Sequence, residues 1–463
     1  MHLMTMQDEL LHDVSPYVTG NYAPVTEEVT ITDLPVVGQI PEELEGRLLR
    51  NGPNPIGDVD MANHHWFIGD GMVHGIRLRG GQAEWYRNRW VGSHNTIEHG
   101  RRTPPQPVSD FGPNTNVIGH NGQTLAIVEA GTAPVELNYE LETIGTCDWG
   151  GTLQNGFSAH PKYDPLTGEM HAMCYSPAEL VDKVQYVVVD GDGQVTKTLP
   201  IHLPSMPMIH DMGLTQKYAV VFDLPVAVDL DMAFAGVTFP LRWFDDYESR
   251  VGLLPRTASS DAEIIWCEID PCYAFHPLNS YDLPDGRVVI DICRFDKLFE
   301  MDRNGPFRDS LPQLERWTVD PVAMRVSREL IDERHQEFPR VAGSVLNERH
   351  RYGYTAAVGN SNNEWQFGNT IKYDFDAGTS VEHDHGPGRG GAEPVFVSRG
   401  GSTTEDDGWI MTVVYDAAED RSDVVILDAQ DLAADAVATI QLPVRIPIGF
   451  HGNWVRDTVT PPS

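Results

Sequence analysis

The chain has 463 residues, with 33 Lys and Arg against 68 Asp and Glu, so its formal net charge is −35. At 41% hydrophobic residues it can bury a large core, which excludes a disordered protein. The acidic balance excludes nucleic acid, or an anionic membrane, as a partner held by charge. Basic residues are mostly arginine, with six Lys against 27 Arg, which is typical of a salt-adapted organism or of a high-GC genome.

The cysteines and the apolar segments limit the cellular setting. The chain has 5 cysteines and no C-x-x-C pair, which argues against a disulfide framework or a zinc site. The start of the sequence lacks a basic segment followed by an apolar run, so no secretory signal is visible. The most apolar long stretch, residues 218–239, contains three aspartates and is not expected to span a membrane. We therefore expect a cytoplasmic protein.

Short apolar runs of strand length recur along the chain. They are rich in Val, Ile, Tyr and Trp, and Gly (42) and Pro (33) are spread between them. Long stretches with a helical apolar period are absent from the sequence pattern. Many short strands at even spacing predict an all-β sandwich, barrel or propeller. The runs are QYVVV (185–189), AEIIWCEI (262–269), RVVIDIC (287–293), DGWIMTVVY (407–415) and DVVILDA (423–429).

A weak internal repeat narrows the choice of fold. In each copy an apolar strand ends in Asp, a turn follows, and a second strand returns, at Asp164, Asp190, Asp320, Asp374 and Asp428. The steps 320 to 374 and 374 to 428 are both 54 residues, and 190 to 320 is 130, or twice 65. Such a period fits about seven units into the chain and predicts a seven-bladed β-propeller. Ordinary hairpins at chance spacing are the alternative. We expect one domain over residues 1–463, with residues 1–20 as a flexible N-terminal arm.

Four of the 18 histidines stand in similar settings beside apolar or glycine-rich sequence. Their separations of 50, 66 and 175 residues match one to three repeat lengths. One histidine from each of four blades could thus converge on the propeller axis. Surface histidines, or core histidines with hydrogen-bond partners, are the alternative, and spacing alone does not decide between them. The four are His160 in FSAHPK, His210 in MIHDMG, His276 in YAFHPLN and His451 in GFHGNW.

A longer set of motifs runs in order from residue 21 to 454. It includes NYAPV, GRLLRNGPNP, HHWFIGDGMVHG, SAHPKYDPLTGEMHA, HDMGLTQKYAVVFDLPV, CYAFHPLNSYD, EFPRV, EPVFV and GFHGNW. Together these motifs resemble the carotenoid cleavage oxygenase family over essentially the whole chain, as a bacterial or archaeal type that cleaves apocarotenoids. The resemblance implies a seven-bladed propeller with iron on its axis and loops forming a dome over a substrate tunnel. By motif, it places a non-haem Fe(II) on His160, His210, His276 and His451.

The resemblance also implies three glutamates that orient the ligands. The matching positions are Glu129 in LAIVEAG, Glu337 in QEFPRV and Glu393 in AEPVFV. A carboxylate that accepts the distal N–H of a metal-bound imidazole fixes the ring and offsets the charge of the metal. The alternative, a solvated surface glutamate, fits poorly with the apolar residues beside Glu129 and Glu393.

The implied chemistry needs one Fe(II) per chain, O₂ as co-substrate and no organic cofactor. Four neutral imidazoles suit Fe(II) and leave coordination positions open for O₂. The expected reaction cleaves a conjugated C=C bond of a carotenoid or apocarotenoid into two carbonyl products. The protein's task is then to position one bond of a polyene and to exclude water.

Substrate contacts are expected from residues beside the motifs. Phe67 resembles an aromatic residue that family members place against the substrate, and Trp66, Tyr273 and Phe275 are further candidates. Relatives that cleave stilbenes carry a Lys immediately before the first orienting Glu, where it meets the substrate's phenol. Here that position is Val128, which cannot serve a buried phenol. This departure favours an apolar polyene.

Three other functions remain as alternatives. The first is a stilbene- or phenylpropenoid-cleaving dioxygenase, of the lignostilbene or isoeugenol type, with the same iron site. The second is a retinoid isomerohydrolase, and the third is a non-catalytic propeller that binds a lipophile.

The partners expected are a lipophilic polyene and a membrane surface. Segment 226–244, VAVDLDMAFAGVTFPLRWF, is expected to form an apolar lip that docks transiently on a membrane, or simply to cap a blade. Insertion of Met232, Phe234, Phe239, Leu241 and Trp243 would gain on the order of 1.5–3 kcal/mol each. No nucleic acid and no obligate protein partner are expected.

Overall fold

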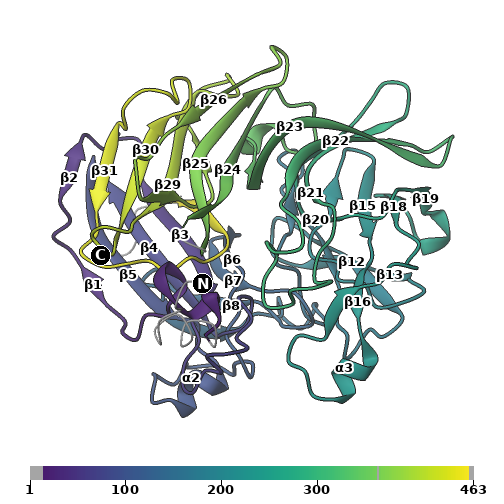
Figure 1. The fold of residues 1–463 in the computed structure, drawn as a ribbon, viewed down its shortest axis with the longest axis horizontal. Helices are drawn as coiled ribbons and strands as arrows, with labels where there is room; N and C mark the ends of the chain where they lie inside the picture. The colour runs from purple at the N-terminus through teal and green to yellow at the C-terminus, as the bar shows by residue number, and fades with distance from the viewer. Residues whose placement is uncertain (1–13, 362–363, 458–463) are drawn as a thin grey trace, which may run out of the picture.

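The protein is described here from a computed structural model, which covers residues 14–361 and 364–457. These residues form mostly β-strands. Figure 1 shows the sheets following one another around the molecule in chain order, so that the C-terminal strands lie beside the N-terminal ones. The short helices and 3₁₀ turns are α2 (His94–Glu98), α3 (Leu230–Phe234), Pro16–Val18, Gly20–Tyr22, Asp261–Glu263 and Gly343–Val345.

The strands group into seven antiparallel units within the described residues, here called blades 1 to 7. Blade 1 holds β1 (Thr30–Ile31), β3 (Gly46–Pro53), β4 (Gly71–Arg79), β5 (Gln82–Trp90) and β32 (Gly452–Arg456). Blade 2 holds β6 (Asn116–His120), β7 (Gln123–Ile127), β8 (Val135–Leu137) and β9 (Thr143–Thr146). Blade 3 holds β10 (Lys162–Tyr163), β11 (Met170–Cys174), β12 (Lys183–Val189) and β13 (Val195–His202).

Blade 4 holds β14 (Gly213–Leu214), β15 (Tyr218–Asp223), β18 (Arg250–Pro255) and β19 (Ile265–Glu268). A separate hairpin of β16 (Val226–Val228) and β17 (Leu241–Trp243) is inserted in it. Blade 5 holds β20 (Tyr273–Asp282), β21 (Val288–Phe295), β22 (Gln313–Asp320) and most of β23 (Arg325–Arg340). Blade 6 takes the end of β23 with β24 (Tyr352–Ser361), β25 (Glu364–Asp374) and β26 (Thr379–His383). Blade 7 holds β2 (Val36–Gly38), β27 (Arg389–Gly391), β28 (Val395–Ser398), β29 (Gly408–Asp416), β30 (Arg421–Asp428) and β31 (Ala438–Gln441).

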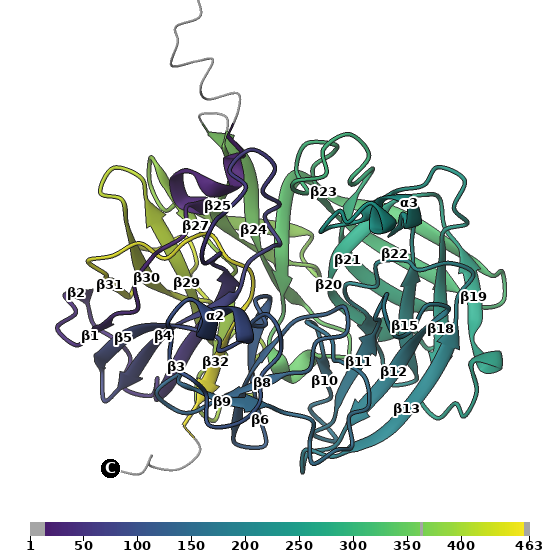
Figure 2. The same ribbon diagram turned by 90° about the horizontal axis from the view of Figure 1, so that it is seen from below.

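The ring is closed by strands from opposite ends of the chain. β32 pairs with β3, from Gly46 opposite Arg456 to Arg50 opposite Gly452, and Figure 2 shows the two strands side by side. At the next blade, N-terminal β2 pairs with C-terminal β31. The predicted propeller is therefore confirmed, and both ends of the described chain are built into it.

The aspartate repeat seen in the sequence has a structural basis. Asp190, Asp320, Asp374 and Asp428 each stand in the outermost hairpin of a blade, between its third and fourth strands. In all four the Oδ1 atom accepts the N–H of the residue two positions on, at 2.9–3.2 Å. This side-chain turn reverses the chain after a strand. Asp164 makes the same turn, but between the first two strands of blade 3.

The N-terminal segment packs against the body of the protein. Residues 1–13 of the arm expected from the sequence lie outside the described residues. Within the rest of the arm, Tyr17 and Val18 are buried, and the Tyr17 ring stacks on Trp66 with their centroids 6.1 Å apart. Tyr17 thus anchors this segment in the apolar core. Over the described ranges, no helix has the length and apolar character that crossing a membrane requires.

Candidate metal centre

The four histidines predicted as ligands stand at the innermost strands of four blades. His160 precedes β10, His210 precedes β14, His276 lies on β20 and His451 precedes β32. Each of these strands is an edge strand of its blade. Blades 1, 3, 4 and 5 therefore supply one imidazole each. The closed propeller brings these side chains together although His160 and His451 are almost 300 residues apart in the sequence.

The imidazoles converge on one point in the interior. One ring nitrogen from each lies within 4.8 Å of all the others, and the Nε2 atoms of His210 and His276 are 3.1 Å apart. All four residues are buried. The Nε2 atom of His160 has no hydrogen-bond partner among the described residues. A buried group of nitrogen acceptors that face one another, one of them unpartnered, fits a divalent transition metal.

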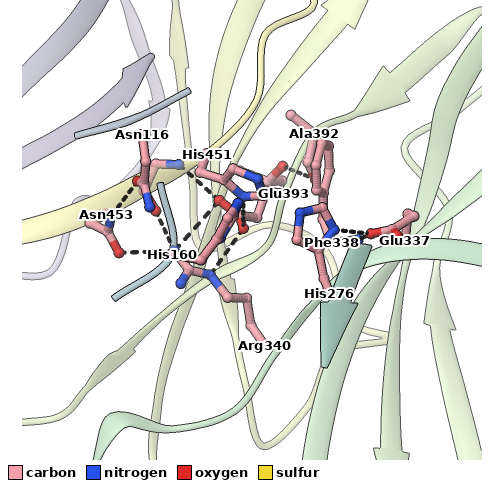
Figure 3. A network of polar contacts seen from close by, with 12 residues as sticks. Asn116, His160, His276, Glu337, Phe338, Arg340, Ala392, Glu393, His451 and Asn453 are labelled. Atoms are coloured by element: carbon pink, nitrogen blue, oxygen red, sulfur yellow. Dashed lines mark hydrogen bonds and ion pairs between the residues drawn. The ribbon is translucent and has the colours of Figure 1, made fainter. Parts of the chain in front are cut away.

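Three of the imidazoles donate their Nδ1–H to a carboxylate. The donor–acceptor distances are 2.6 Å for His210 to Glu129, 2.6 Å for His276 to Glu337 and 2.9 Å for His451 to Glu393. Figure 3 shows the last two pairs, with Arg340 on the far side of Glu393. A proton on Nδ1 leaves the Nε2 lone pair directed at the centre, which is the tautomer a metal needs.

The glutamates come from the blades that supply no histidine. Glu129 follows β7 of blade 2, Glu337 lies where β23 enters blade 6, and Glu393 lies between β27 and β28 of blade 7. Two of them are followed by a residue in the left-handed region, Ala130 with φ 66° and Phe338 with φ 54°. Such backbone is costly for residues other than glycine, and it persists where the surrounding structure imposes it. Every blade thus contributes a side chain to the centre.

Burial sets the protonation of the cluster. It holds the pKa of the His160 and His276 imidazoles well below their usual range, and neutral imidazole is the form that binds metal. Burial also raises the pKa of the Glu337 carboxyl well above its usual value. Burial acts in the same direction on Glu393, but Arg340 and His451 outweigh it, so the pKa of Glu393 lies below its usual value. A bound dication would favour the ionised carboxylates.

A cavity of about 1060 Å³ reaches the cluster. Its walls include His210, His276 and His451, together with eleven Phe, Tyr and Trp side chains. The volume lies just above the range for sites that bind drug-sized ligands, about 300–1000 Å³. The site therefore suits a long apolar molecule with one segment beside the histidines. The Phe275 and Phe338 rings contact the cluster histidines directly, and Phe67 contacts Phe275 and Phe450 farther along the wall.

Four of the five residues predicted to contact substrate line this cavity: Phe67, Trp66, Val128 and Phe275. Phe67 lies in the middle of the aromatic wall, with ring centroids 5.8 Å from Phe275 and 5.5 Å from Phe450. Tyr273 is not among the lining residues. It lies behind Phe275, and its hydroxyl donates to the carbonyl of Met208 at 3.1 Å. Tyr273 is thus part of the core, because its polar end is already satisfied inside the protein.

Much of the wall was missed by sequence reasoning. Phe338 and Phe450 adjoin Glu337 and His451, so their motifs carried a signal that could have found them. Phe307 and Phe367 also line the cavity, but they stand in no motif. Nothing local distinguishes a phenylalanine that faces a cavity from one in the core.

The fold and this centre define a β-propeller protein with a buried four-histidine cluster beside a large cavity. The family model described as retinal pigment epithelial membrane protein, the carotenoid oxygenase family, matches residues 22–456. The chain is 40% identical to a carotenoid cleavage oxygenase from Mycobacterium tuberculosis, with 96% of this chain and 98% of that protein covered. The chain belongs to the carotenoid oxygenase family.

Two solved structures illustrate the range of this likeness. A variant of the Synechocystis apocarotenoid oxygenase has a TM-score of 0.84 at 28% identity, covering 96% of this chain and 100% of that one. The lignostilbene dioxygenase of Pseudomonas brassicacearum has a TM-score of 0.87 at 25% identity, covering 96% and 99%. The backbone therefore does not separate polyene from stilbene cleavage, and that choice depends on the cavity.

Proposed function

We propose that this protein is an Fe(II)-dependent dioxygenase that cleaves one conjugated C=C bond of a carotenoid or apocarotenoid with O₂, giving two carbonyl products. The observation that carries the proposal is the four-histidine cluster at the wall of a large aromatic cavity. The curated relative from M. tuberculosis, which matches over nearly the whole of both chains, supports it. We further propose that residues 1–463 act as one propeller domain, because β3 and β32 join its two ends.

In this proposal His160, His210, His276 and His451 hold the iron. Bound Fe(II) supplies the activation of O₂, which does not react with a closed-shell alkene unaided. Glu129, Glu337 and Glu393 hold the Nδ1 protons, so that the imidazoles do not rotate and their Nε2 lone pairs stay directed at the metal.

The aromatic wall selects and positions the alkene. The Phe275 ring stands edge-on to His210 at 5.0 Å, and the Phe338 ring lies 5.0 Å from His451. Between such rings a polyene gains contact area and excludes water from the cluster. The cleaved bond is then the one that the wall places beside the histidines.

Val128 supports a polyene as the substrate. It lines the cavity immediately before Glu129, and its side chain offers no partner to a phenol. A phenol buried without a partner costs about 1–3 kcal/mol. The stilbene-cleaving alternative rests on the backbone match to the lignostilbene enzyme, a match that the apocarotenoid oxygenase shares, and product analysis separates the two.

The test is a competition between substrates. Metal-free protein is loaded anaerobically with Fe(II), given O₂ with an apocarotenal and a hydroxystilbene together, and the aldehydes are identified by mass spectrometry. Shortened apocarotenals, with O₂ consumed, are the expected products. Benzaldehydes alone would assign the protein to stilbene cleavage, and an isomerised polyene without O₂ consumption would indicate an isomerohydrolase. A preparation that cannot be loaded with metal would indicate a non-catalytic lipophile binder.

The apolar segment 226–244 lines one side of the cavity and is partly exposed at the surface. Helix α3 stands at the lower edge of the molecule in Figure 1, and its Phe234 side chain is 86% exposed. Leu230 and Val237 are also exposed, while Met232 and Phe239 line the cavity. We propose that Leu230, Phe234 and Val237 dock on a membrane that holds the substrate. Leu241 and Trp243 cannot take part as expected from the sequence, because both are buried on the inner face of β17.

Membrane docking is tested by flotation with neutral phosphatidylcholine vesicles. Burial of a phenylalanine gains about 1.5–3 kcal/mol, so F234S should lower the partition coefficient between vesicles and water by at least about tenfold. Val322, which is 92% exposed on the β22–β23 turn, gives a matched control, V322S, that should not change binding. Equal binding of F234S and the unaltered protein would exclude this surface.

A further inference from the structure

His160 differs from the other three histidines in its outer partner, by which we mean the group that faces Nδ1 of the imidazole on the side away from the cluster. Among the described residues, no hydrogen bond or ion pair joins its ring to a glutamate. The carboxylate that faces it is Asp211, whose Oδ2 lies 3.9 Å from Nδ1 of His160, too far for a hydrogen bond. The same oxygen lies 2.7 Å from Nζ of Lys162. Asp211 therefore gives its hydrogen bond to an ammonium group and not to the imidazole.

The Lys162–Asp211 ion pair is a fixed part of the interior. Lys162 lies on β10 of blade 3 and Asp211 precedes β14 of blade 4, so the pair joins the blades that carry His160 and His210. The Asp211 side chain is 2% exposed and that of Lys162 is 21% exposed. The second oxygen of Asp211 accepts the N–H of Met212 at 2.6 Å. A buried carboxylate with both oxygens engaged has little freedom to move.

We propose that the Lys162–Asp211 pair is the outer partner of His160 and that its two charges cancel at this ligand, whereas the other three ligands each face a glutamate. This inference rests on the proposed metal site. His160 is then the least firmly oriented ligand, because no hydrogen bond from its ring fixes it. The role of Asp211 is to neutralise Lys162, whose ammonium would otherwise repel a dication across a short distance.

The test measures metal binding instead of turnover. Metal-free, full-length protein is titrated with Co²⁺, and binding is followed by the visible absorption of the coordinated ion. The change Asp211→Asn keeps the shape of the side chain and its acceptor for Met212, but leaves the ammonium uncompensated. We expect D211N to raise the dissociation constant by about 10–100-fold, the usual range for a lost outer partner. The double variant D211N/K162M removes both charges and should return to within about threefold of the unaltered protein.

A matched pair elsewhere supplies the control. Lys372 and Asp406 also lie 2.7 Å apart and are similarly buried, but neither is near the cluster. D406N should lower thermal stability about as much as D211N and leave the Co²⁺ dissociation constant unchanged.

Each result of this experiment has a defined meaning. Unchanged Co²⁺ binding in D211N would overturn the inference and leave the proposed function intact. Equal weakening in D211N and D211N/K162M would overturn the charge cancellation, because Asp211 would then act on His160 alone. Should D211N fail to fold, D211S takes its place, because it leaves the same uncompensated ammonium: weakened binding that K162M restores supports the inference, and unchanged binding overturns it. Failure of the unaltered protein to bind Co²⁺ would overturn the proposed metal site as well.

Discussion

Replacing Phe338 by glycine and by alanine tests whether the wall of the cavity is held under backbone strain. Phe338 has φ 54° directly after Glu337, and its ring stacks on Phe367 with the centroids 4.5 Å apart. Phe367 lies on β25 and does not have a positive φ. The two residues therefore share one packing contact but differ in backbone conformation.

The magnitudes follow from these two conformations. Either truncation of a buried phenylalanine costs about 3–5 kcal/mol through lost packing. At Phe338 a left-handed alanine costs about 1–2 kcal/mol that glycine avoids, which exceeds the 0.5–1 kcal/mol entropy cost of glycine. F338G should therefore be more stable than F338A by about 0.5–1 kcal/mol. At Phe367 only the entropy cost remains, so F367G should be less stable than F367A by about the same amount.

The assay is urea unfolding of the four variants, followed by tryptophan fluorescence under one set of conditions. The expected signature is a reversal of the order of glycine and alanine between the two positions. If alanine is the more stable replacement at both positions, Phe338 is not strained and its left-handed backbone does not aim its ring. If glycine is better at both, the difference has another origin than the conformation of Phe338.

Three further predictions concern the metal centre. H210A should lose both bound iron, measured by metal analysis, and turnover; an iron-replete, active variant would refute the ligand assignment. E337Q should fold normally but bind Co²⁺ about 10–100-fold more weakly, whereas E315Q, which removes a buried carboxylate paired with Arg294 and Arg328, should bind it normally. Chelation should lower the melting temperature, because a ligand that binds only the folded state stabilises it in proportion to RT ln(1 + [L]/Kd); equal melting curves with and without saturating Co²⁺ would mean that the cluster does not hold the ion in the folded state.

Those parts of the fold that depend on local chemistry were open to prediction. The aspartate turns at 190, 320, 374 and 428 mark the outermost hairpins of blades 3, 5, 6 and 7. The repeat was weak because blades 1, 2 and 4 lack it. In blade 4, the last two strands are joined through the 3₁₀ turn Asp261–Glu263 instead. The long strand β23 pairs with β22 of blade 5 and with β24 of blade 6, and so joins the two blades in one sheet. The sequence pattern does not predict this sharing of one strand by two blades.

The candidate site was predictable only where a motif marks it. Each histidine stands beside recognisable residues, but spacing alone does not show that four edge strands meet. Leu241 and Trp243 were misplaced at the surface because an apolar stretch does not reveal which face of a hairpin points inward; here Arg242 takes the outer face between them. The separation of His160 from any glutamate depends on an ion pair between two blades, which no local pattern contains.

The contact of β32 with β3 also bears on the order in which the chain becomes active. His451 stands immediately before β32, so synthesis from the N-terminus supplies three imidazoles long before the fourth. Pairing with β3 joins segments some 400 residues apart and is the slowest kind of contact to form. A nascent or truncated chain that ends before this strand has an incomplete ligand set. The centre that we propose to activate oxygen is therefore completed only after the ring around it has closed, so a half-made chain is not exposed to that chemistry.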